Sequence, residues 1–284
     1  MSTRLGQTIL STTPISNGRR VELTFGRENG SARIPAVLLL PGDDVTTGHA
    51  GPAALLLHGF SSRKEQMAET VGASLLAKGI ASLSIDLPLH GERIAEGNET
   101  SWGVVGGYDR VFDASAMRSP LALAGAWRTA QQDARLAIAY LGARREVDRA
   151  SVAVVGYSMG SFLGVHVAAE EPSVRALVLA AGGDFPERMP YARALRLLND
   201  PLRAVRRLDG RPLLMLHGRH DPTVRPEQAQ RLFDSAREPK ELRWYDAGHH
   251  LPARALDDAA GWLTERLAVP AAFIETEEPA SRVG

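Results

Sequence analysis

From about residue 53 onward, short apolar runs of strand length alternate with longer segments whose apolar residues recur at helical spacing. The runs are "AALLLH", "IASLSID", "SVAVVG", "VRALVLAA", "RPLLMLHG" and "ELRWYDA". Most of them are continuous rather than alternating, which is typical of parallel strands that are buried on both faces. The alternation therefore predicts an α/β fold with a mostly parallel, doubly wound sheet.

Two further strand-like runs, "RVELTF" and "IPAVLLL", are joined by the short polar segment "GRENGSA". They predict an antiparallel hairpin at the N-terminal edge of the sheet, for eight strands in all. Segments near 91–127 and 183–210 interrupt the alternation, and insertions of this length usually form lids or substrate walls. We expect a single domain over residues 1–268 with these two short cap insertions, followed by a flexible polar tail at 269–284.

Composition excludes several classes of function. The 33 basic and 33 acidic residues balance, and no basic cluster with interleaved aromatic residues predicts a nucleic-acid partner. The chain has no cysteine, which excludes disulfides, thiol nucleophiles and cysteine-ligated metals. No signal-peptide region or membrane-length apolar run stands out, so we expect a cytoplasmic monomer or homodimer with no membrane partner.

The segment "VAVVGYSMGSFLGVHVA" begins as a strand, turns at residues 156–160 and resumes at helical spacing. A serine between glycines at a strand-to-helix turn is the pattern of a nucleophile elbow, so Ser158 is the candidate nucleophile. The helix that follows directs its free amides towards the group that this serine attacks. The amides of Phe60 and Met159 are the candidate oxyanion hole.

A serine nucleophile needs a general base that an acid holds in one orientation. Asp221, in "HGRHDPTV", and His249, in "WYDAGHHLP", follow two later strands, at the sheet edge where ligands bind in open α/β folds. Two alternatives stay open: Asp221 could instead cap the helix that starts near Arg225, and His250 could replace His249 as the base.

Taken together, these motifs resemble the α/β-hydrolase superfamily over about residues 20–268. The resemblance lies in "HGF" at 58–60, "DLPLHGER" at 86–93, "GYSMG" at 156–160, "HGRHDPTV" and "AGHH". Within the superfamily, the chain is most similar to the dienelactone-hydrolase and acetyl-esterase-like branch. Dienelactone hydrolases use a cysteine where this chain has Ser158, so the resemblance implies a serine carboxylesterase that needs no cofactor.

The expected reaction is hydrolysis of small or medium carboxylic esters through an acyl-enzyme intermediate. A peptidase, a thioesterase or a lactone hydrolase would use the same triad, because specificity lies in the insertions. From a different class, a non-catalytic ligand-binding receptor could keep the same pocket.

Several other side chains fit either a packing role or a functional role. Those that could contact a substrate, or simply pack, are Tyr157, Trp102, Phe185, Met189, Tyr191 and His250. Asp86 is expected to anchor the turn after its strand, and His58 to bond nearby backbone. His217, His220 and Asp221 could form a metal site, but their spacing on a strand does not obviously converge, so no metal is expected.

Overall fold

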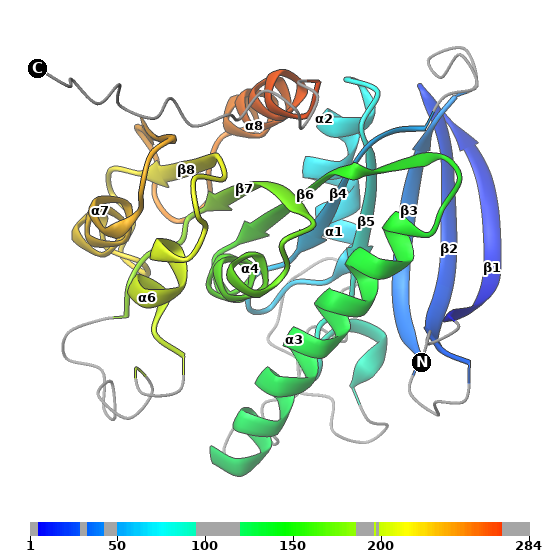
Figure 1. Cartoon of the computed structure of the whole chain (residues 1–284), viewed down its shortest axis with the longest axis horizontal. Coiled ribbons are helices and arrows are strands. Elements are labelled where there is room, and N and C mark those ends of the chain that lie inside the picture. The colour runs from blue at the N-terminus through cyan, green and yellow to red at the C-terminus, as the bar shows by residue number, and fades with distance from the viewer. Residues whose placement is uncertain are drawn as a thin grey trace, which may run out of the picture.

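The computed structural model describes residues 5–28, 33–42, 50–94, 120–185, 196 and 199–268. Within these ranges the strands form one nine-stranded sheet in the order β1-β2-β3-β5-β4-β6-β7-β8-β9 (Figure 1). The pairs from β5 through β9 are parallel, whereas β1, β2 and β3 join the sheet antiparallel. The strands are β1 Leu5–Ile15, β2 Gly18–Arg27, β3 Ile34–Pro41, β4 Gly51–Leu57, β5 Ala81–Ile85, β6 Val147–Tyr157, β7 Val174–Ala180, β8 Leu213–Gly218 and β9 Lys240–Tyr245.

Helices cover both faces of the sheet. One face carries α8 and the continuous segment α1–η1–α2, whereas the other carries α3, α4, α6 and α7 (Figure 1). This arrangement confirms the predicted α/β-hydrolase fold. The bounds are α1 Lys64–Met67, η1 Ala68–Gly72, α2 Ala73–Leu76, η2 Gly91–Arg93, α3 Pro120–Gly142, α4 Met159–Glu170, α6 Pro201–Arg206, α7 Pro226–Ser235 and α8 Ala253–Leu267.

The central strands are apolar throughout because successive residues enter two different cores. In β6, Val154 packs on the α3 and α4 side and Val155 on the α8 side; in β4, Leu55 and Leu56 divide in the same way. All four are buried. A strand covered on both faces needs no polar face, which explains the continuous runs in the sequence.

The expected count of eight strands was wrong by one. The missed strand, β1, pairs with β2 and occupies the edge that the sequence assigned to the β2–β3 hairpin. The hairpin itself is confirmed, with Phe25 opposite Ile34. Most of β1 is exposed, including Ile9 and Leu10, so its sequence lacks the burial pattern by which a strand is recognised.

Only parts of the two predicted insertions are described. The first contributes η2 and the start of α3, and the second contributes α6. The expected tail at 269–284 lies outside the described residues. Among the helices that the structure describes, none combines the length and the apolar character that crossing a bilayer requires.

Candidate active site

Ser158 is the single residue between the end of β6 and the start of α4, and its backbone has φ 51° and ψ −114°. Positive φ is strained for a residue with a side chain, as expected of a nucleophile elbow. The neighbouring glycines permit this tight turn. A Cβ on Gly156 would lie 2.3 Å from the carbonyl oxygen of Gly160, and a Cβ on Gly160 would lie 2.0 Å from that of Leu57.

A chain of two hydrogen bonds joins the side chains that follow β6, β8 and β9. Ser158 Oγ lies 2.9 Å from His249 Nε2, and His249 Nδ1 lies 2.8 Å from Asp221 Oδ2. In the tautomer that activates a serine, Nδ1–H donates to the carboxylate and Nε2 accepts the hydroxyl proton. The structure thus brings together the three residues that the sequence singled out, although they are 91 residues apart at most.

The Asp221 side chain is fully buried. Its Oδ1 accepts hydrogen bonds from the amides of Thr223 and Val224, which leaves Oδ2 for His249. The N-cap of α7 is Arg225, so Asp221 bonds the turn before that helix rather than capping it. His250, the alternative base, is exposed, and its ring centroid lies 6.0 Å from that of His249.

Tyr157 links the elbow to the loop that carries His249. Its hydroxyl donates a hydrogen bond of 2.7 Å to the carbonyl oxygen of His249 and accepts one of 2.9 Å from the amide of Leu251. Burial raises the pKa of Tyr157, so the hydroxyl stays protonated and able to donate. The polar end of this side chain is therefore engaged by backbone, a role that the sequence pattern did not reveal.

The segment of residues 58–60 lies against the elbow, since a Cβ on Gly59 would lie 3.2 Å from the Cβ of Ser158. His58 is fully buried; its Nδ1 lies 2.8 Å from the carbonyl oxygen of Gly59, and its Nε2 accepts the amide of Leu87 at 3.0 Å. Because Nε2 accepts, Nδ1–H is the donor to Gly59, which orients the peptide group that carries the Phe60 amide. Burial lowers the pKa of His58 to about 3, so this ring stays neutral.

A buried ionic cluster holds the loop after β5. The Asp86 carboxylate accepts the amides of Lys64 and Glu92 and pairs with Lys64 Nζ at 3.2 Å, as expected of a residue that anchors its turn. Lys64 also pairs with Glu65 and Glu92. Burial raises the pKa of Asp86, and the Lys64 ammonium opposes only part of the rise. Burial alone would lower the pKa of Lys64, but the surrounding carboxylates raise it above its ordinary value.

Of the remaining candidates, the structure describes Phe185, His217 and His220. Phe185 stacks on Phe162 of α4, with ring centroids 5.6 Å apart, and Trp102, Met189 and Tyr191 lie outside the described residues. His217 is buried and donates Nε2–H to the carbonyl oxygen of Val224, whereas exposed His220 bonds Asp246. His217 Nε2 lies 3.7 Å from Asp221 Oδ2, but His220 does not join them, and the described part of the chain contains no group of three or more potential ligands.

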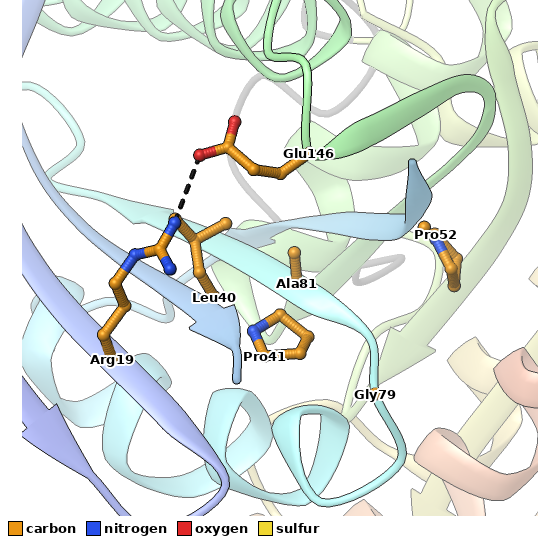
Figure 2. Close-up of a pocket in the computed structure, with 8 residues that line it drawn as sticks. Arg19, Leu40, Pro41, Pro52, Gly79, Ala81 and Glu146 are labelled. Atoms are coloured by element: carbon orange, nitrogen blue, oxygen red, sulfur yellow. Dashed lines mark hydrogen bonds and ion pairs between the residues drawn. The ribbon is translucent and has the colours of Figure 1, made fainter. Parts of the chain in front are cut away.

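Two depressions lie at the amino ends of the strands, opposite to the end that carries Ser158, Asp221 and His249. A cavity of about 30 Å³ sits beside the starts of β4 and β5, where Arg19 pairs with Glu146 at 3.2 Å (Figure 2). An open depression of about 250 Å³ lies between α3 and the starts of β6 and β7. Ligands of open α/β sheets bind at the carboxyl ends of the strands, so neither depression is the candidate site.

Comparison with known proteins places the chain in a class. The alpha/beta hydrolase family model matches residues 54–281, so the chain belongs to the alpha/beta hydrolase family. A sequence comparison with curated proteins finds no significant match.

Solved structures share the fold at low sequence identity. A cold-adapted esterase from an Arctic intertidal metagenomic library is 19% identical with a TM-score of 0.68, over 94% of this chain and 99% of that one. Acetyl xylan esterase 1 from Thermoanaerobacterium sp. is 21% identical with a TM-score of 0.66, over 95% and 89%. The acetyl xylan esterase from Paenibacillus sp. R4 is 16% identical with a TM-score of 0.68, over 94% and 90%.

Proposed function

We propose that this protein is a serine carboxylesterase that hydrolyses small or medium carboxylic esters through an acyl-enzyme intermediate. The observation that carries the proposal is the hydrogen-bonded chain from Ser158 through His249 to Asp221, at the carboxyl ends of three strands. The esterases with the same fold make an ester the first substrate class to test.

In the first half of the reaction, Ser158 Oγ attacks the ester carbonyl carbon while His249 Nε2 takes the hydroxyl proton. Asp221 stabilises the resulting imidazolium through Nδ1–H. The tetrahedral intermediate collapses when the bond to the alcohol oxygen breaks, and His249 returns its proton to that oxygen. In the second half, His249 activates a water that attacks the acyl-enzyme, which releases the acid and restores the Ser158 hydroxyl.

The negative charge that develops on the carbonyl oxygen needs donors that are already in position. We assign this role to the backbone amides of Met159, the first residue of α4, and Phe60, whose loop packs against Ser158. Removal of one such donor in other hydrolases costs about 10²–10³ in kcat. The peptide group between Gly59 and Phe60 is held by His58, which supports this assignment.

Fluorophosphonate labelling followed by intact-protein mass spectrometry tests the proposal, with nitrophenyl acetate turnover measured in parallel. We expect one adduct on the wild type, none on Ser158→Ala, and loss of turnover in that variant. Ser62, a partly exposed serine that bonds Gln66, provides the matched control: Ser62→Ala should label normally. Turnover retained by Ser158→Ala would contradict the assignment of the nucleophile.

A comparison of substrate classes on the same preparation separates the alternative functions. Aminoacyl anilides, thioesters and lactones require the same triad, so their kcat/KM values are compared with those of the nitrophenyl esters on the same preparation. A ratio that favours an anilide, a thioester or a lactone would replace the ester as the substrate class. Tight binding of a small molecule without labelling or turnover would instead indicate a receptor.

A further inference from the structure

An apolar cavity of about 70 Å³ is lined in part by Met159, the residue that follows the proposed nucleophile. Its walls come from the loop at residues 87–90 after β5, from one side of α3 and from the first turns of α4. Leu123 and Trp127 contribute from α3, and Met159 and Leu163 from α4. None of the lining residues is an acid, a lysine or an arginine, and burial lowers the pKa of His90, which keeps that ring neutral. The cavity therefore suits an uncharged, apolar group.

The cavity lies next to the segments that carry the two amides assigned to the oxyanion hole. Met159, which carries one of them, lines the cavity directly. His90 also lines it, and its ring centroid lies 5.7 Å from that of Phe60, which carries the other amide. A substrate whose carbonyl group is bound by these amides would therefore have the cavity nearby.

The strand order decides which part of an ester faces the cavity. Ser158 follows β6; Phe60 and the loop at 87–90 follow β4 and β5, on one side of it in the sheet. Asp221 and His249 follow β8 and β9, on the other side. Because His249 must protonate the leaving alcohol, the alcohol lies towards β8 and β9. The acyl chain is then left on the β5 side, where the cavity is.

We propose that this cavity binds the acyl chain of the substrate and limits it to uncharged acyl groups of up to four carbons. An apolar cavity of about 150 Å³ binds benzene, with six carbons, so about 70 Å³ has room for about three. The carbonyl carbon stays at Ser158 Oγ, which makes butanoyl the longest chain that fits. This inference rests on the proposed esterase function and adds its acyl specificity.

Acyl-length profiles test the inference. We expect kcat/KM of the wild type to rise about sixteenfold from 4-nitrophenyl acetate to butanoate, since each of the two added methylenes is worth about fourfold when buried. It should then fall for the hexanoate and the octanoate, whose chains exceed the cavity. A profile that keeps rising to the octanoate would overturn the size limit.

Substitutions on α3 locate the specificity. Ala126→Leu adds atoms to the cavity wall and should lower the butanoate-to-acetate ratio about tenfold. Leu123→Ala, at the partly exposed mouth, should move the optimum to the hexanoate. Leu121, on the same helix, is 85% exposed and does not line the cavity. Leu121→Ala is therefore the control, and its acyl-length profile should match that of the wild type.

Each result has one meaning. If Ala126→Leu and Leu123→Ala label with fluorophosphonate and keep the wild-type acyl profile, the cavity does not hold the acyl chain. If Ala126→Leu changes the ratio between butyl acetate and methyl acetate instead, the cavity holds the alcohol and the inference is overturned. If the wild type itself neither labels nor hydrolyses any ester, the proposed function has failed, and the inference falls with it.

Discussion

The hydroxyl of Tyr157, one residue before the proposed nucleophile, donates a 2.7 Å hydrogen bond to the carbonyl oxygen of His249, the proposed base. The same oxygen of Tyr157 accepts the amide of Leu251, so it holds the base loop on both sides of His250. The strand that positions the nucleophile therefore also positions the base.

We predict that Tyr157→Phe lowers kcat about tenfold or more with little change in KM. The variant leaves the His249 carbonyl and the Leu251 amide without their partner, which lets the imidazole move relative to Ser158. Steady-state kinetics with nitrophenyl acetate measures both constants. Tyr140→Phe is the matched control, because its hydroxyl bonds Gln7 and Arg144 away from the elbow. Equal effects of the two substitutions on kcat would exclude a positioning role for Tyr157.

The adjacent histidines allow a second matched comparison. His249→Ala removes the ring that contacts both Ser158 and Asp221, so we expect kcat to fall by about 10⁴-fold or more. His250→Ala removes an exposed ring with no contact to Ser158 and should leave kcat within about threefold. Fluorophosphonate labelling rates should follow the same order. Loss of activity in His250→Ala alone would reverse the assignment of the base.

Much of this fold was predictable, because the central strands are buried on both faces. Strands such as β4 and β6 are continuous apolar runs between helical segments, a pattern that survives in a single sequence. The β1 strand was not predictable in this way. It is exposed on both faces and is held mainly by backbone pairing with β2, which any sequence of residues with free amides can make.

The candidate site likewise has features that the sequence predicts and features that it does not. Ser158, Asp221 and His249 follow strand ends in a recognisable order, so sequence alone selects them. The bond from Tyr157 to the His249 carbonyl and the cavity between α3 and α4 leave no such trace. Both depend on distances between segments far apart in the chain, and the residue types involved are equally common in ordinary packing.

The buried ionic cluster under the loop at 86–94 yields a stability prediction. Lys64→Met would leave the fully buried Asp86 carboxylate without its cation, so we expect the free energy of unfolding to fall by about 3–5 kcal/mol. Urea denaturation at neutral pH measures this change. In the double variant Lys64→Met with Asp86→Asn, no buried charge remains unpaired, and part of the loss should be recovered. If the two changes simply added, the pair would not be coupled.

Acid sensitivity should come in part from His166 on α4. The side chain is buried against Trp127, and its Nε2 has no hydrogen-bond partner within the described part of the chain. Burial lowers the pKa of His166 to about 4, whereas an unfolded histidine titrates near its ordinary value of 6.5. Between these values the unfolded chain binds a proton that the folded chain does not. The free energy of unfolding therefore falls as the pH decreases through this window.

Replacement of His166 by leucine removes this linkage without creating a large cavity, since the two side chains are similar in size. Each pH unit between about 6 and 4.5 should cost the wild type up to about 1.4 kcal/mol more than His166→Leu. Urea denaturation of both proteins at pH 7.5, 6.0 and 5.0 measures the difference. Because buried His58 is present in both, its own proton linkage cancels from the comparison. Stability curves that stay parallel across this range would show that His166 is already protonated in the folded protein or that it does not charge on unfolding.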